Sequence, residues 1–128
     1  MRLLLDTCTF LWIATDAKEL SSRVRSLFED PDNEVHLSAV SAWEIGLKHG
    51  LGRLHLPEAP DSFVPRYREA HGISPLPLGE GEALQVGKLP PHHSDPFDRM
   101  LVCQAIVGGL TILTPDPEIA RYPVQVAW

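Results

Sequence analysis

Short apolar runs alternate along this chain with segments of helical periodicity. Runs rich in leucine, isoleucine and valine end at polar or turn residues and predict buried strands at 2–6, 34–38 and 110–114, with a last short strand at an edge of the sheet, at 124–127. Between the runs, apolar residues recur every three to four positions. This spacing predicts helices at 10–14, 21–29, 39–49, 63–70, 80–86 and 96–107.

The alternation of strands and helices predicts an α/β fold with a mainly parallel sheet and helices on both faces. Parallel strands need crossover connections, and a helix is the usual one. The Gly/Pro-punctuated stretches at 50–60 and 87–96 are too short to link separate domains. We therefore expect residues 1–128 to form a single domain.

Composition and charge exclude several classes of protein. The chain is 44% hydrophobic and 22% charged, which excludes a disordered or collagen-like chain. Eleven basic against seventeen acidic residues give a net charge of −6, so no broad cationic face can hold nucleic acid. A nucleic-acid function would need a local basic rim or a bound metal ion.

Neither a targeting segment nor a disulfide framework is visible. The apolar run after Arg2 stops at Asp6, before it reaches the length of a signal sequence, and no apolar stretch has the length of a membrane span. We expect a soluble cytoplasmic protein with no membrane contact. Cys8 and Cys103 lie far apart and form no CxxC unit, which predicts free thiols.

Four acidic residues lie where a ligand site of an α/β sheet is expected. Asp6 ends the first predicted strand, and Asp116 follows the strand at 110–114. Ligands of open α/β sheets bind outside the carboxyl ends of the strands. Glu44 lies about two turns into the helix after 34–38. Asp98 begins the helix at 96–107, on the face that carries its apolar residues.

Helix capping is an alternative explanation for most of these acids taken singly. Asp95 and Asp116 each precede a proline, as N-cap acids do, and Asp98 lies in a first turn, where the helix dipole favours negative charge. Glu44 has the spacing of a capping box, and Asp6 could be an ordinary turn residue. Capping would scatter the acids over the surface, whereas strand ends and helix starts on one sheet edge would bring them together.

Four converging carboxylates would repel one another and raise their pKa values unless cations neutralise them. Hard oxygen ligands without a thiolate or an ordered histidine pair suit Mg²⁺ or Mn²⁺ rather than Zn²⁺. Such an ion lowers the pKa of bound water and neutralises charge on a phosphate. The implied chemistry is hydrolysis of a phosphodiester.

Several motifs together resemble the PIN-domain ribonucleases of the VapC toxin type. They are LLLDT at 3–7, SAVSAWEI at 38–45, DPFDRMLVCQA at 95–105, TPD at 114–116 and YPVQVAW at 122–128, and they span essentially the whole chain. The resemblance implies a three-layer α/β/α PIN-like fold and a metal-dependent endoribonuclease. It also implies the toxin of a type II toxin-antitoxin pair, whose cognate antitoxin protein blocks the active site.

By this resemblance, the family's catalytic and metal-binding acids fall on Asp6, Glu44, Asp98 and Asp116. These would hold Mg²⁺ or Mn²⁺, with water attacking an RNA phosphodiester. Asp95 is an additional acid, interpreted as an N-cap. One departure is that relatives often have histidine two residues after the first acid, where this chain has cysteine, which bears on substrate preference. We also expect a homodimer, with the helix at 63–70 as a candidate contact for a second copy or for an antitoxin.

A small basic rim is the expected contact for RNA phosphates. Lys48, Arg53 and Arg99 are the candidates, with Arg99 the foremost because it adjoins Asp98. Solvated surface charge is the alternative for each. Adjacent histidines such as His92 and His93 point to opposite sides of an extended chain, so we interpret them as part of a loop near the site rather than as a metal pair.

Two further predictions concern Trp43 and the class of function. Trp43 has the spacing of a core stripe with Val40 and Leu47, which predicts a buried side chain. A non-catalytic Mg²⁺-binding signalling domain of receiver type is the alternative function, with a phosphatase third. Receiver domains are expected to carry an acidic pair after the first strand and a lysine after a late one. Thr7 follows Asp6 and Pro115 follows the strand at 110–114, which disfavours this alternative.

Overall fold

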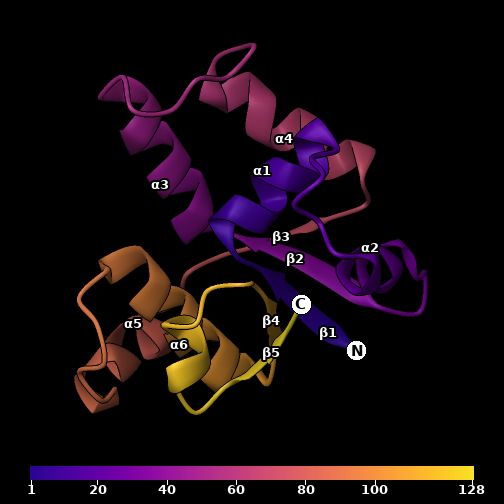
Figure 1. The fold of residues 1–128 in the computed structure, drawn as a ribbon. Helices are drawn as coiled ribbons and strands as arrows, with labels where there is room; N and C mark the ends of the chain where they lie inside the picture. The colour runs from indigo at the N-terminus through magenta and orange to yellow at the C-terminus, as the bar shows by residue number, and fades with distance from the viewer.

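A computed structural model describes all residues, 1–128, and its centre is a five-stranded sheet (Figure 1). The strand order is β3-β2-β1-β4-β5, and every neighbouring pair is parallel. The strands are β1 (Arg2–Leu5), β2 (Glu34–Ser38), β3 (Ser74–Leu76), β4 (Thr111–Leu113) and β5 (Gln125–Ala127). The predicted parallel α/β fold is confirmed, including the final strand at an edge.

Helices cover both faces of this sheet, which gives the three layers that the sequence predicts (Figure 1). One face carries α1 (Thr7–Thr15), α2 (Ser22–Glu29), α3 (Ala39–Gly50) and α4 (Pro60–Ala70). The other carries α5 (Glu80–Leu84), the 3₁₀ helix η1 (Gln85–Lys88), α6 (Pro96–Gly108) and the 3₁₀ helix η2 (Ile119–Arg121). None of the helices combines the length and the apolar composition needed to cross a membrane.

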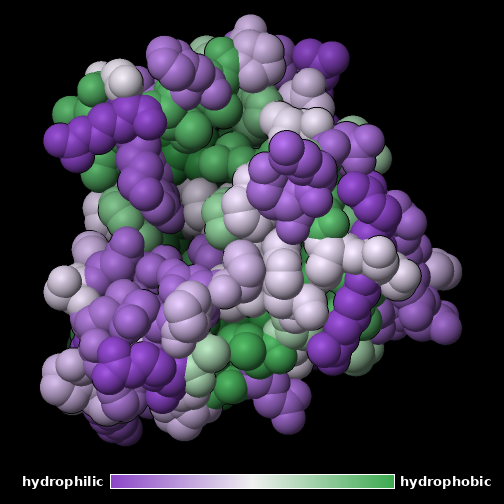
Figure 2. Space-filling model, in the orientation of Figure 1, coloured by the Kyte–Doolittle hydropathy of each residue, from purple (hydrophilic) through white to green (hydrophobic).

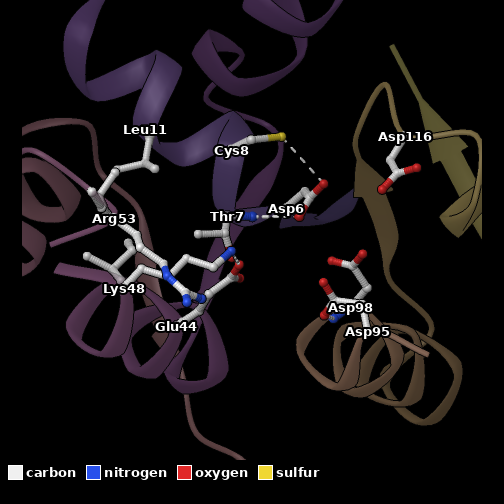
Figure 3. A pocket seen from close by; sticks show the side chains of 12 residues that line it. Asp6, Thr7, Cys8, Leu11, Glu44, Lys48, Arg53, Asp95, Asp98 and Asp116 are labelled. Atoms are coloured by element: carbon white, nitrogen blue, oxygen red, sulfur yellow. Dashed lines mark hydrogen bonds and ion pairs between the residues drawn. The ribbon is translucent and has the colours of Figure 1, made fainter. Parts of the chain in front are cut away.

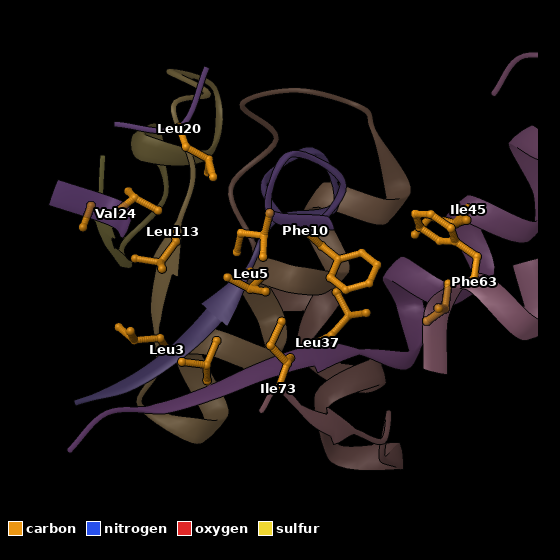
Figure 4. Close-up of a cluster of buried hydrophobic side chains, with 14 residues drawn as sticks. Leu3, Leu5, Phe10, Leu20, Val24, Leu37, Ile45, Phe63, Ile73 and Leu113 are labelled. Atoms are coloured by element: carbon orange, nitrogen blue, oxygen red, sulfur yellow. The ribbon is translucent and has the colours of Figure 1, made fainter. Parts of the chain in front are cut away.

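The alternation of side chains along β1 explains why the sheet holds two cores. Leu3 and Leu5 are completely buried in the cluster under α1 to α4 (Figure 4), whereas Leu4 is buried in the cluster under α6. Successive strand residues point to opposite faces, so a run of leucines can fill both sides. Each fully buried leucine side chain contributes about 1.5–3 kcal/mol.

Helices α1 and α3 begin directly at the carboxyl ends of β1 and β2, and this positions the site. Asp6 is the N-cap of α1, immediately after β1, and Ser38 is the N-cap of α3 at the end of β2. Asp95 caps α6, as predicted, by accepting a hydrogen bond from the backbone N–H of Asp98 at 3.0 Å. Three helix starts therefore bring polar side chains to the same edge of the sheet.

The structure differs from the sequence analysis at one strand, which was missed, and at Trp43, whose predicted burial is wrong. Strand β3 was not predicted, because it is three residues long and contains Pro75, which weakens any strand signal. Trp43 is 59% exposed rather than buried. Helix α3 turns Val40 and Ile45 toward the two core clusters, which leaves Trp43 outside, where its ring packs edge-on against Phe97 at a centroid distance of 4.8 Å.

Candidate functional site

A cavity of about 390 Å³ lies at the carboxyl ends of the central strands, between α1, α3 and the start of α6 (Figure 3). Its walls combine a ring of carboxylates with two basic side chains and a few apolar ones. The lining residues are Asp6, Thr7, Cys8, Leu11, Glu44, Ile45, Lys48, Arg53, Leu54, Asp95, Asp98 and Asp116. All four acids singled out from the sequence line it, so the convergence expected from strand ends and helix starts is present.

Asp6 is the most firmly held of these carboxylates. It is 5% exposed, and one oxygen accepts a hydrogen bond from the backbone N–H of Thr7 at 2.7 Å. The other oxygen accepts from Thr114 Oγ1 at 2.7 Å and from Cys8 Sγ at 3.5 Å. Burial raises the pKa of Asp6, and these hydrogen bonds offset part of the effect. The carboxylate is therefore fixed in one orientation between β1 and β4.

Cys8 lies beside the same carboxylate and is itself partly buried. Burial, followed by the negative charge of Asp6, raises the pKa of the thiol to about 12. A thiol with that pKa stays protonated near neutral pH, which makes it a weak nucleophile and a poor metal ligand. Both cysteines are free, as predicted.

Glu44 presents an unpaired oxygen inside the protein. Its side chain is buried, and Oε2 forms an ion pair with Lys48 one turn further along α3. Oε1 is buried and has no hydrogen-bond partner. A buried acceptor without a partner costs free energy, which a cation or a donor in the cavity would recover. Hydrogen bonding to Glu44 raises the pKa of Lys48, so the ammonium stays charged.

Asp98 carries the clearest sign of crowding among the acids. Its side chain is 16% exposed, and Oδ2 lies 3.3 Å from Nε2 of His93. Burial, and then the charges of Asp6 and Asp95, raise the pKa of Asp98 to about 7, against a smaller opposing effect of the His93 hydrogen bond. Burial and the neighbouring negative charges together thus favour a proton or another cation at Asp98.

Asp116 completes the ring from the segment after β4. Its backbone N–H donates to Thr114 Oγ1 at 3.1 Å, and its own Oδ1 accepts from the backbone N–H of Glu118 at 2.9 Å. This short turn directs the side chain into the cavity, opposite Asp6 in Figure 3, although prolines flank it on both sides. Thr114 links the two acids, because it accepts from one and donates to the other.

The donor chemistry fits a divalent cation, although the side chains as they stand do not form a group of three or more Asp, Glu, His or Cys that could hold one. Two of the carboxylates are paired with basic side chains of the protein: Glu44 with Lys48 and Asp98 with His93. The fit rests on hard oxygen donors, on the unpartnered Oε1 of Glu44 and on the burial and neighbouring negative charges that raise the pKa of Asp98. These features suit Mg²⁺ or Mn²⁺.

The predicted basic rim is present in part. Lys48 and Arg53 line the cavity on the side of Glu44, facing Asp95 and Asp98 across it (Figure 3). Arg99 does not line it, which corrects the expectation that it leads the rim. Its guanidinium donates to the hydroxyl of Tyr122 at 2.9 Å and to the carbonyl of Pro90 at 3.0 Å. Neighbouring residues of a helix point about 100° apart, so adjacency to Asp98 in sequence does not place Arg99 on the same side.

Two residues that contact the acids were missed from the sequence. From the sequence, Thr114 belongs to a strand and to the TPD motif, and His93 to a loop near the site, but neither is assigned a contact with an acid. The structure places both against predicted acids, Asp6 and Asp98 respectively. The available signal was position: Thr114 ends a strand two residues before Asp116, and His93 precedes the cap of α6 by two residues.

Comparison with known proteins identifies both a family and a fold. The model of the PIN domain family matches residues 3–125. Ribonuclease VapC16 of Mycobacterium tuberculosis is 40% identical over 60 residues, which are 47% of this chain and 43% of that protein. The matched region therefore spans less than half of this curated relative.

Solved structures with the same fold cover nearly the whole chain. VapBC2 from Rickettsia felis, bound to a DNA fragment from its promoter, aligns with a TM-score of 0.74 and 15% identity, over 99% of this chain and 98% of that one. DNA-bound VapBC from Salmonella typhimurium aligns with a TM-score of 0.67 and 18% identity, over 99% of this chain and 97% of that one. FitAcB from Neisseria gonorrhoeae aligns with a TM-score of 0.60 and 21% identity, over 97% of this chain and 95% of that one. At these identities the likeness extends to the fold.

Proposed function

The chain belongs to the PIN domain family, and on that premise we propose that it is a metal-dependent endoribonuclease, the toxin of a type II toxin-antitoxin pair. The observation that carries the proposal is the ring of carboxylates around one cavity, to which Asp6, Glu44, Asp98 and Asp116 all contribute. Ribonuclease VapC16, the curated relative, supports RNA as the substrate.

In this proposal, Asp6, Asp98 and Asp116 hold one or two Mg²⁺ or Mn²⁺ ions, and Glu44 is either a further ligand or orients the attacking water. When bound, such an ion lowers the pKa of water and neutralises charge on the phosphate. Asp6 is already fixed by Thr7 and Thr114, so its carboxylate is held in place before any ion binds.

The two basic side chains of the cavity suit the phosphate backbone of RNA. Lys48 and Arg53 lie on the Glu44 side, and the pKa of Lys48 is raised, so its ammonium is charged at neutral pH. Phosphate contacts position a nucleic acid without reading its sequence. We assign them the role of holding the substrate across the carboxylates, which offsets the net charge of −6 locally.

A cognate antitoxin protein and a second copy of the chain are the proposed protein partners. The likeness to VapBC structures supports the antitoxin. Apolar side chains gather over the region of α3 and α4 in Figure 2. Trp43, Leu47 and Leu51 are 59%, 44% and 59% exposed at a spacing of four residues, which supports association of this face of α3 with a second copy.

Cleavage of labelled RNA by the purified chain tests the proposed function. We expect cleavage with Mg²⁺ or Mn²⁺, none with EDTA, and none for Asp6→Asn, while circular dichroism shows that this variant is folded. Asp32→Asn, on the exposed loop before β2, is the matched control and should cleave normally. Water as the nucleophile predicts 5′-phosphate and 3′-hydroxyl ends.

Three outcomes would contradict the proposal. Products with 2′,3′-cyclic phosphates would show that the 2′-hydroxyl attacks instead of water. Cleavage that survives EDTA, or that Asp6→Asn retains, would remove the carboxylate cavity from the reaction. Cation binding without any cleavage would favour the non-catalytic Mg²⁺-binding alternative.

A further inference from the structure

Behind Asp98, on the side away from the cavity, lies a hydrogen-bonded group of three side chains: His93, Tyr122 and Arg99. His93 Nε2 is 3.3 Å from Asp98 Oδ2, and His93 Nδ1 is 2.7 Å from the hydroxyl of Tyr122. Arg99 donates to that hydroxyl at 2.9 Å and to the carbonyl of His93 at 3.4 Å. The group joins the loop before α6, the first turn of α6 and the segment after η2.

The donors and acceptors of this group determine which imidazole nitrogen carries hydrogen. A guanidinium can only donate, so the Tyr122 oxygen accepts from Arg99. The same oxygen accepts from the backbone N–H of His93 at 3.3 Å, so both of its lone pairs are used. Its hydroxyl hydrogen therefore points at the nearest acceptor, His93 Nδ1 at 2.7 Å, rather than at the carbonyl of His93 at 3.5 Å. A neutral imidazole that accepts at Nδ1 carries its hydrogen on Nε2. That hydrogen points at Oδ2 of Asp98.

Burial makes this arrangement specific. Tyr122 is 3% exposed, and the side chains of His93 and Asp98 are 15% and 16% exposed, so little water competes for these contacts. The start of α6 does not depend on His93, because Asp95 already caps the helix. The contact with His93 therefore orients the Asp98 carboxylate and is not needed to cap the helix.

We propose that His93, oriented by Tyr122 and Arg99, is a positioning residue that holds Oδ2 of Asp98 and leaves Oδ1 to face the cavity. The inference deepens the proposed function, on which its link to cation binding rests, but the hydrogen-bond geometry is a property of the chain alone. Residues that orient a metal-binding side chain in this way typically change metal affinity by about 10–100-fold when they are replaced.

The imidazole tautomer is the first test and needs neither metal nor RNA. ¹⁵N NMR of the metal-free protein should show His93 with hydrogen on Nε2 and an unprotonated Nδ1, the signals being assigned by their loss in His93→Gln. Tyr122→Phe removes the hydroxyl that Nδ1 accepts from and should raise the share of the other tautomer. A wild-type spectrum with hydrogen on Nδ1 alone would overturn the proposal.

Affinity for Mn²⁺ alone, measured by electron paramagnetic resonance, is the second test. His93→Ala should weaken binding by about 10–100-fold. His93→Gln, which keeps a nitrogen donor near the position of Nε2, should recover most of the loss. His92→Ala is the matched control, because the His92 ring contacts Tyr122 edge-on at 5.0 Å but makes no bond to Asp98. Thermal melting of each variant separates lost affinity from lost stability.

The outcomes distinguish this inference from the proposed function. Unchanged Mn²⁺ affinity in His93→Ala, or an equal loss in His92→Ala, would overturn the positioning role while leaving ribonuclease activity possible. If the wild type binds no Mn²⁺, the proposed metal-dependent function fails. The tautomer of His93 then still decides whether it holds Asp98.

Discussion

Replacing Asp98 by asparagine removes one charge from a cavity that four other carboxylates line. In the folded protein the pKa of Asp98 is raised from 3.8 to about 7, mainly by burial and then by the charges of Asp6 and Asp95. The folded state thus holds this proton more tightly than the unfolded state. The free energy of unfolding that this proton contributes is fully present below 3.8, the pKa of Asp98 in the unfolded chain, and is lost as the pH rises through about 7.

The size of the effect follows from the shift. About three pKa units correspond to at most about 4 kcal/mol between low pH and pH above 7. We expect about half of this, because the side chain is 16% exposed and retains some water. Between about pH 5 and about pH 8 only about two of these pKa units contribute, so the stability of Asp98→Asn relative to the wild type should rise by about 1.4 kcal/mol.

Urea unfolding in EDTA at these two pH values measures the effect. Any change that the asparagine causes independently of pH cancels in the comparison. Saturating Mg²⁺ or Mn²⁺ should then stabilise the wild type at about pH 8, by about 2.7 kcal/mol at 100 times its Kd, and stabilise Asp98→Asn much less. Asp32→Asn, exposed and outside the cavity, should respond to cations like the wild type.

Two results would refute this reasoning. A stability difference between Asp98→Asn and the wild type that is equal at both pH values would show that neither burial nor the neighbouring charges raise the pKa of Asp98 in the folded protein. Equal stabilisation of both proteins by Mg²⁺ or Mn²⁺ would show that Asp98 is not among the groups that bind the cation.

Three further predictions concern neighbouring parts of the structure. Leu101→Ala should cost about 2–5 kcal/mol in urea unfolding, because this side chain of α6 is completely buried in the core cluster that also holds Leu4 of β1, whereas Leu47→Ala, at a 44% exposed position, should cost less than about 0.5 kcal/mol. Cys8, whose thiol pKa is raised to about 12, should react with iodoacetamide near pH 8 at least about tenfold more slowly than a cysteine in a peptide; mass spectrometry that finds equal rates would contradict this. Thr114→Val removes a 2.7 Å hydrogen bond to Asp6 and should weaken Mn²⁺ binding by about tenfold or more, and unchanged affinity would remove this threonine from the site.

Much of the fold and four acids of the cavity were predictable from local pattern. A run such as Leu3 to Leu5 shows a buried strand by composition alone, and an acid that ends it must lie at the sheet edge, because a parallel sheet aligns its carboxyl ends. The same reasoning places Asp116 after β4. Helix caps are equally local, since Asp95 bonds to a residue three positions away.

Contacts between distant segments, and the side to which each side chain turns, were not predictable in this way. Thr114 and Asp6 are 108 positions apart, and Tyr122 and His93 are 29 positions apart, so no periodicity of the chain relates them. Trp43 had the right spacing for a core but lies on the outer side of α3, where 59% of its surface is exposed. Periodicity specifies which residues share a face of a helix, whereas the packing of whole elements determines which face is covered.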